Sequence, residues 1–361
     1  MDNTFYVDTF PGKSDDEQIA SCLNEAKQQK GSTVIFRGRE FIISKAIEVG
    51  SDMTVIVDDC TIKQADEAYD NVFRGANIKL DPEKPYEHAL EITQLENVKI
   101  LGRGKAVIEG CEKNRRGFHT VLNEEQDMTG DFWGWRTYQV LFCNAKNLEI
   151  AGLTFIKNRC WCITIDFSIE VYVHDLSIFS TVKNGDGVHF MSGCHDILVE
   201  RIKGRTSDDT VAVQSGLLWF TFPFRNYLYP FTPAKCIYDK LTTREMDCHD
   251  IVIRDITSGG RHHNIACVSM FDTCIYNLTI ENIRDTCRDE PYPATVMLYA
   301  GIYDVPGTLR DITVRGVHSI ADTCVTTNCN IDNFLLSDLH QYGVGCRFLG
   351  SFPYLTINRT I

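Results

Sequence analysis

The sequence predicts an all-β protein folded as a right-handed, single-stranded parallel β-helix with a short N-terminal capping helix. From about residue 90 onward, a polar turn followed by alternating apolar residues recurs, with copies beginning at Leu95, Ala145, Ser168, Cys194, Cys248, Cys274 and Gly307. Where no insertion intervenes, copies are roughly 22 to 34 residues apart, which is the period of a solenoid coil. No segment of helix length separates them, so a doubly wound α/β fold is excluded.

The N-terminal segment differs from these copies and predicts a helix over Ser14 to Lys30. Ser14 is followed three residues later by Glu17, the pattern of a capping box, and Ile19, Leu23 and Ala26 recur at helical spacing. An uncovered solenoid end exposes apolar surface and an unpaired strand edge. We therefore expect an N-terminal cap over about residues 1–50 of a single β-helix domain that spans residues 1–361.

Two stretches interrupt the repeat, at about residues 111–136 and 215–247. Both carry tryptophans, and the second is rich in aromatic residues around Trp219. Aromatic faces stack on sugar rings, but such a loop could equally pack on itself or form a contact between subunits of a homo-oligomer. The sequence leaves these alternatives open.

Composition limits the partners. The 361 residues carry a formal net charge of -13 and no compensating basic stripe, which argues against nucleic acid and anionic membranes. No apolar run is long enough to span a bilayer. The N-terminus lacks the features of a secretory signal, so we expect a cytoplasmic protein unless such a signal has been removed. The 15 cysteines are scattered without zinc-site spacing, which favours buried free thiols, such as Cys267, and no metal or cofactor.

Two neighbouring coils carry the acidic residues of the candidate site. One contains NGDGVHF from Asn184, and the next contains SDDTVAV from Ser207. If Val188 and Phe190 face the core, as Val211 and Val213 must, His189 points outward into the same groove as Ala212. Asp186, Asp208 and Asp209 then lie on one face, one coil apart, and their mutual repulsion raises at least one pKa. Calcium binding or Asx turns at coil corners would be the structural alternative.

These motifs resemble those of the polygalacturonase family, family 28 of the glycoside hydrolases, within the pectate-lyase-like β-helix superfamily. The resemblance rests on Asn-x-Asp-Gly at Asn184, Asp208-Asp209 about 22 residues later, and the Gly-Gly segment at Gly259 that leads to His263. The opening GKSDDEQIASCLNEAKQQKGSTVIFRGREFIIS also resembles the start of that superfamily. The likeness covers about residues 8–315.

The resemblance implies an inverting glycoside hydrolase without a cofactor. Asp208 matches the general acid, Asp186 and Asp209 match the pair that orients the attacking water, and His263 matches an active-site histidine. Inversion needs room for that water between the carboxyls. The remaining candidate substrate-binding residues are His189, Arg261, His262, Met297, Tyr299, Trp219, Gln214 and Asn184.

The chain departs from this family one coil later. The strand Thr295 to Tyr299 has Met297 and Tyr299 where the family's Arg-Ile-Lys motif places two cations that hold a uronate carboxylate. Charge-assisted bonds of that kind are worth about 1.5 to 3 kcal/mol each. We therefore expect a neutral sugar at the cleavage point of an oligo- or polysaccharide. Arg225 or Arg261 could still restore a cation from elsewhere.

Three other functions stay open on the same fold. A polysaccharide lyase or epimerase would need a cation cluster, which is not evident. A non-catalytic carbohydrate-binding β-helix would need aromatic and polar side chains but no crowding of three acids. A metal-binding scaffold is the weakest of the three, because the acids lack the ligand spacing of calcium repeats.

Overall fold

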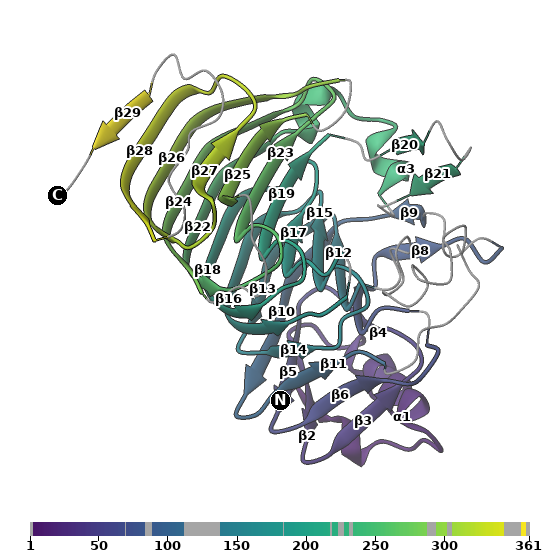
Figure 1. The fold of residues 1–361 in the computed structure, drawn as a ribbon. Coiled ribbons are helices and arrows are strands. Elements are labelled where there is room, and N and C mark those ends of the chain that lie inside the picture. Colours follow the sequence, from purple (N-terminus) through teal and green to yellow (C-terminus); the bar gives the residue numbers. More distant parts are fainter. Residues whose placement is uncertain are drawn as a thin grey trace.

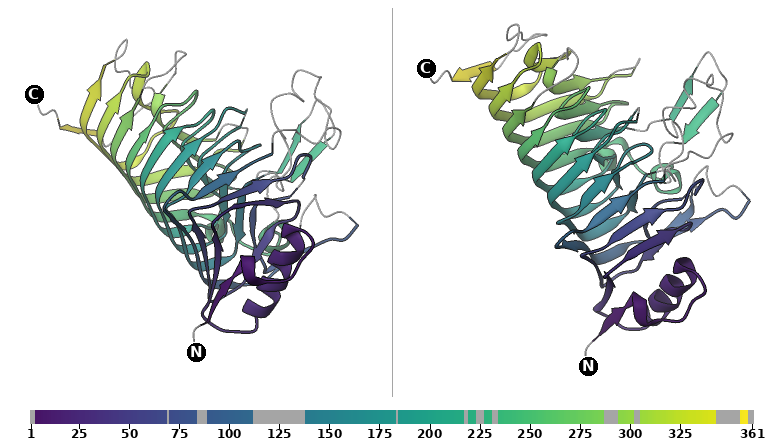
Figure 2. Two further views of the ribbon diagram at one scale, coloured as in Figure 1. Left: turned by 90° about the horizontal axis from the view of Figure 1, so that it is seen from below. Right: turned by 60° about the horizontal axis from the view of Figure 1, so that its bottom comes forward.

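A computed structural model of the protein describes residues 3–68, 70–83, 89–111, 138–182, 184–216, 219–222, 227–230, 234–286, 294–301, 305–342 and 355–358. Its strands stack in a column, with the N-terminal helix at one end and the C-terminal strands at the other (Figures 1 and 2). Within these residues no helix is long and apolar enough to cross a membrane.

Most strands belong to two parallel sheets, here called sheet A and sheet B. The main path of sheet A is β1 (Thr4–Tyr6), β2 (Ser32–Arg37), β5 (Met53–Asp58), β10 (Leu95–Arg103), β13 (Ala145–Ala151), β16 (Ile169–Phe179), β18 (His195–Arg205), β22 (Cys248–Ser258), β24 (Cys274–Asp285), β26 (Thr308–Ser319), β28 (Asp332–Gln341) and β29 (Leu355–Asn358). Beside it pair β3 (Glu40–Ile43), β6 (Thr61–Gln64), β11 (Val107–Glu109) and β14 (Thr154–Ile156). Each main-path strand pairs with the next, one coil later.

Sheet B runs along another side of the column and carries the candidate site. Its order is β4 (Ile47–Val49), β7 (Phe73–Gly75), β12 (Val140–Cys143), β15 (Ile163–Asp166), β17 (Val188–Phe190), β19 (Val211–Ser215), β23 (Ile265–Ser269), β25 (Ala294–Ala300) and β27 (Thr323–Thr327). Parallel strands joined by crossovers close in a right-handed sense. The fold is therefore the right-handed parallel β-helix that the repeat predicts.

The core between the sheets is one continuous apolar cluster from Phe5 to Leu336. It contains the eight residues that the sequence places inward: Val188, Phe190, Val211, Val213, Ile265, Cys267, Val296 and Leu298. That prediction is confirmed. The described cysteines are all free thiols, most of them buried, as the sequence also predicts.

The capping helix is α1 (Asp15–Ala26), and Ser14 is its N-cap, with the side chain accepting a hydrogen bond from the Glu17 amide. Ile19, Leu23 and Ala26 are buried in the core cluster, as expected. The helix ends four residues before the predicted Lys30, and the exposed run that follows leads to Gly31, which has a positive φ of 72°. A short 3-10 turn, η1 (Val7–Thr9), precedes α1.

The solenoid begins earlier than the sequence analysis expects. β1 to β4 lie within residues 1–50, the range expected to form the cap, and all of them pair in parallel with strands of later coils. Within the described residues, α1 packs against all four of these strands, and η1 packs against β2. These first strands are short, three to six residues, so their alternation is too brief to stand out as a repeat.

The second insertion packs on the outer face of sheet B. It contains the hairpin β20 (Trp219–Phe222) and β21 (Tyr227–Pro230), the short helix α3 (Lys235–Tyr238) and the 3-10 turn η3 (Thr243–Met246). Ala234, Tyr238 and Met246 join a second apolar cluster with outward residues of sheet B. A further hairpin, β8 (Ile78–Leu80) and β9 (Ala89–Ile92), contacts α3 (Figure 1). The first insertion, about 111–136, lies outside the described residues except for Cys111.

Candidate active site

Asp186, Asp209 and His263 occupy the same place in three successive coils. Each lies two residues before a strand of sheet B, namely β17, β19 and β23. The Gly187 amide donates to the Asp209 carbonyl and the Thr210 amide donates to the His263 carbonyl, both at 2.9 Å. Neighbouring strands are about 4.8 Å apart. The fold thus stacks two of the predicted carboxylates and the predicted histidine in one column.

The turn before Asp186 explains why this segment reads Asn-Gly. Asn184 has a φ of 53°, a left-handed conformation that asparagine tolerates well. At Gly185, a Cβ atom would lie 1.9 Å from the Ser180 hydroxyl and 2.3 Å from that of Ser207. Only glycine fits there, and it allows the chain to pass from the turn through Asp186 into β17.

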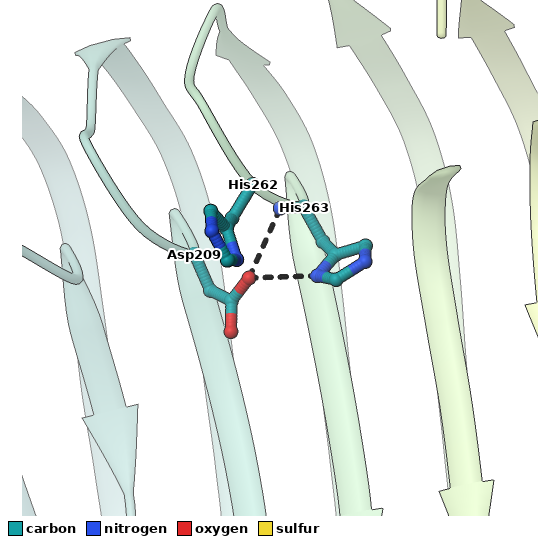
Figure 3. Close-up of side chains that lie close together, drawn as sticks. All are labelled: Asp209, His262 and His263. Atoms are coloured by element: carbon teal, nitrogen blue, oxygen red, sulfur yellow. Dashed lines mark hydrogen bonds and ion pairs between the residues drawn. The ribbon is translucent and has the colours of Figure 1, made fainter. Parts of the chain in front are cut away.

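Asp208 and His262 each come one residue before a member of this column, directly before Asp209 and His263. The amide and Nδ1 of His263 lie 3.0 and 2.9 Å from Asp209 Oδ1. Nδ1 of His262 lies 3.1 Å from Asp208 Oδ1, and the His262 side chain is 57% exposed. Figure 3 shows the Asp209 carboxylate between the two imidazole rings. Asp209, His262 and His263 are also the group whose ligand atoms, among the described residues, lie close enough together for a metal ion.

Asp186 is buried and pairs with His189. Nδ1 of His189 lies 2.9 Å from Asp186 Oδ2, and Nε2 lies 3.2 Å from Gln214 Oε1. Burial lowers the pKa of His189 to about 4, so its ring is neutral at pH 7. Burial, together with the charges of Asp208 and Asp209, raises the pKa of Asp186 well above its usual value. The clustered acids therefore shift a pKa in the predicted direction, at Asp186.

These contacts determine where the proton lies. A neutral imidazole donates from one nitrogen and accepts at the other. With Gln214 oriented so that Oε1 faces the ring, the Nε2–H of His189 donates to it, and the bare Nδ1 then accepts from a protonated Asp186 Oδ2. The other oxygen of Asp186, Oδ1, is buried without a hydrogen-bond partner in the described part of the chain. Such an acceptor is a place for a water or a substrate hydroxyl.

Outward-facing residues of sheet B lie next to Asp186 and Asp209 along the same strands. His189 pairs in register with Ala212, Ala212 with Ala266, and Ala266 with Met297. Tyr299 lies one outward position beyond Met297. The strand positions agree with the sequence analysis, but His189, Gln214 and Met297 are 5%, 9% and 8% exposed. Met297 belongs to the second apolar cluster, and His189 stacks on Trp161, another member of it, so direct contact of these residues with a substrate stays a prediction.

Other expected residues lie elsewhere or cannot be placed. Arg261 is exposed next to His262. Trp219 begins β20, and its side chain is outside the described part of the structure.

Sequence reasoning missed Trp161. Its ring stacks on His189 with centroids 3.8 Å apart, and Tyr138 stacks on its other face at 5.3 Å. Trp161 lies two residues before β15, the place that Asp186 and Asp209 take in the following coils. That spacing is the signal that could have identified it. Trp161 covers one face of His189 and so contributes to the burial that lowers its pKa.

Comparison with known proteins finds likeness in structure but not in sequence. No protein-family model matches the chain, and no curated protein sequence matches it. The exopolygalacturonase of Thermotoga maritima superposes with a TM-score of 0.57 at 15% identity, over 99% of this chain and 92% of that chain. The endo-xylogalacturonan hydrolase of Aspergillus tubingensis gives 0.52 at 13% identity, over 98% and 95%.

A third similar structure is the tailspike protein of E. coli bacteriophage HK620, in complex with a pentasaccharide. Its TM-score is 0.62 at 15% identity, over 99% of this chain and 64% of the tailspike. The chain thus spans under two thirds of the tailspike but nearly all of the two hydrolases. Together these likenesses show that the protein has the parallel β-helix fold of these polygalacturonan-degrading and tailspike structures.

Proposed function

We propose that the protein is an inverting glycoside hydrolase that cleaves an oligo- or polysaccharide with a neutral sugar at the cleavage point. The observation that supports it most is the column of Asp186, Asp209 and His263 beside Asp208, on the outer face of one sheet. A binding module needs no such crowding of acids. The exopolygalacturonase and the xylogalacturonan hydrolase that share the fold are both named as enzymes acting on galacturonate-containing glycans.

In this proposal Asp208 is the general acid that protonates the leaving oxygen. Asp186 and Asp209 hold the attacking water on the opposite face of the sugar, as the sequence analysis predicts. Because the contacts of His189 keep Asp186 protonated, Asp209 is the member of the pair that accepts the proton from water. The His263 amide and ring fix the Asp209 carboxylate. The free Oδ1 of Asp186 accepts a hydrogen bond from the same water.

The first test replaces Asp208 with Asn. General acid catalysis contributes about 10²- to 10⁴-fold, so turnover of the best glycan or aryl glycoside should fall by at least about that factor. Asp322→Asn, at an exposed carboxylate before β27, is the matched control and should leave turnover unchanged. Near-normal turnover in Asp208→Asn, with thermal unfolding unaltered, would remove Asp208 from this role. Proton NMR of the first product anomer tests inversion.

The second test concerns substrate choice. Polygalacturonate should be a poor substrate, and a neutral glycan of similar length a better one, because no cation occupies positions 297 and 299. Tyr299→Lys, alone and with Met297→Arg, should raise affinity for uronate-containing oligosaccharides and lower activity on the neutral glycan. Since Met297 is buried, Tyr299→Lys alone separates charge from misfolding. Efficient cleavage of polygalacturonate by the unaltered protein would refute the neutral-sugar assignment.

A carbohydrate-binding function without catalysis is the second candidate, favoured by the likeness to a tailspike that holds a pentasaccharide. The same Asp208→Asn variant separates the two. A binding protein should keep its glycan affinity and show no glycan turnover in either form, whereas a hydrolase should lose turnover.

A further inference from the structure

Asp209, His262 and His263 form a group that the proposed hydrolysis does not fully explain. Each offers one ligand atom, and the three atoms lie within 4.8 Å of one another. They come from two adjacent coils, and the Asp209 carboxylate lies between the two rings (Figure 3). We propose that these three side chains bind a divalent transition-metal ion of the Zn²⁺ class. This departs from the expectation of a metal-free site.

To bind an ion, the three ligand atoms must move only slightly closer together than the 4.8 Å within which they lie. Zn²⁺ binds imidazole nitrogen and carboxylate oxygen at about 2.0 to 2.2 Å, which puts the ligand atoms of a tetrahedral site roughly 3.4 Å apart. The side chain that has room to move is His262, which is 57% exposed. The rings of His262 and His263 are nearly perpendicular, at 89°, with centroids 6.0 Å apart. Rotation of His262 about its side-chain bonds can therefore bring its nitrogen to an ion held by the other two ligands.

The ligand set selects the metal. Two imidazoles and one carboxylate suit zinc, iron, cobalt and nickel, whereas magnesium and calcium prefer oxygen ligands alone. Three protein ligands also leave a position open for water or a substrate oxygen. Asp208 lies 3.1 Å from the His262 ring, so it can orient that ring as carboxylates commonly do behind metal-bound histidines.

Binding of the ion would change the hydrogen bond between His263 and Asp209. His263 Nδ1 now lies 2.9 Å from Asp209 Oδ1. If Nδ1 is the ligand atom, the ion replaces that hydrogen bond, and any proton on Nδ1 is released to solvent, because a metal ligand must be the bare nitrogen. The second oxygen of Asp209 or the same Oδ1 then coordinates the ion. No redox step or other reactant is involved.

The consequence for catalysis rests on the proposed function. A metal on Asp209 would occupy the carboxylate that accepts the proton from water, so Zn²⁺ should inhibit hydrolysis, and a chelator should restore it. The site would then be an inhibitory metal site of the enzyme. Binding itself does not depend on that proposal and can be measured without any substrate.

The experiment titrates chelator-treated, full-length protein with Co²⁺, read by visible d–d absorbance, and with Zn²⁺, read by calorimetry. We expect one equivalent of either ion to bind with a dissociation constant below about 10 µM. His262→Gln and Asp209→Asn should each weaken binding by about ten- to a hundredfold or more. His340→Gln is the matched control, because His340 also contacts a carboxylate, Asp338, at 2.7 Å, but lies outside the group.

Two results would overturn the site: no binding below about 1 mM, or binding that the His340 variant weakens as much as the His262 variant. His262 is exposed, so its replacement should fold, and circular dichroism of each variant checks this. If Zn²⁺ binds but the chelator-treated, metal-free protein cleaves no glycan, the hydrolase proposal fails and the metal site stands. If Asp208→Asn abolishes hydrolysis but no ion binds, only the metal site fails.

Discussion

At the scale of single residues, the Asp186–His189 pair couples the site to pH through one proton. In the unfolded chain, Asp186 and His189 have their ordinary pKa values of 3.8 and 6.5. The unfolded chain therefore holds the proton on His189 below pH 6.5 and releases it above pH 6.5. The folded protein keeps it on Asp186 instead. Between about pH 4 and 6.5 both states bind one proton, so the pair contributes no pH dependence to stability.

Above pH 6.5 the balance changes, and this gives a prediction. Because burial raises the pKa of Asp186, the folded state then binds more protons than the unfolded state for as long as Asp186 keeps its proton, so stability should fall as pH rises until Asp186 titrates. Asp186→Asn removes this loss. His189 then acts alone, and its lowered pKa makes the variant lose stability as pH falls from 6.5 towards about 4.

Urea unfolding of the unaltered protein and of Asp186→Asn at about pH 5, 6.5 and 8, in metal-free buffer, measures this difference in free energy. Parallel pH profiles for the two proteins would mean that the proton does not lie on Asp186. At this scale, the sequence predicted the clustered acids and their neighbours, but not which acid is neutral. That depends on the burial of Asp186 and His189 and on the Trp161 ring stacked on His189, which the motif does not contain.

At the scale of elements, left-handed corners set the shape of each coil. Asn147, Asp196, Asp250 and Asn277 stand in one register column, and each has a φ between 50° and 58°. In several coils the side chains also bond along the column, as Asn147 does to Asn97 at 2.8 Å. Glu170 takes the same corner in the copy that begins at Ser168, with a φ of 55°, so Asn and Asp are favoured at this corner rather than required. The sequence analysis had recognised the corner only as a polar turn.

Asn147 allows a test of this role. Asn147→Ala should lower the free energy of unfolding by about 2 kcal/mol, because alanine is strained at a φ of 58° and one hydrogen bond is lost. Asn147→Gly should cost only about 1 kcal/mol, since glycine removes the hydrogen bond without the strain. Equal losses in the two variants, measured by urea unfolding, would show that the corner conformation is not the cause.

Also at this scale, the sequence predicted the strands that carry a full alternation and missed those that do not. β16, β18 and β24 have 11 or 12 residues and were recognised from their copies. β4 and β7, with three residues each, are defined by their neighbours in the stack rather than by their own pattern. A strand's place in a solenoid depends on the neighbouring coils, which are distant in sequence. Local periodicity therefore does not predict the short strands of the first coils.

At the scale of the whole molecule, the column must be closed at its ends, and α1 does so next to β1. β1 is the first strand of sheet A, and among the described strands it pairs with β2 alone. α1 contacts β1, β2, β3 and β4 and buries Ile19, Cys22, Leu23 and Ala26 in the core cluster. A helix in this place covers the apolar end and limits pairing with another chain.

The last prediction tests the cap. Leu23 is 5% exposed, so Leu23→Asp buries an unpaired carboxylate and should lower the free energy of unfolding by at least about 3 kcal/mol, or detach α1 from the column. Detachment would expose the end of the core and β1, so concentration-dependent self-association should follow, measured by light scattering. Asn24→Asp adds the same charge to the exposed face of α1 and should change neither property. If Leu23→Asp is as stable and as monodisperse as Asn24→Asp, then α1 does not close the solenoid, and the core must hold without it.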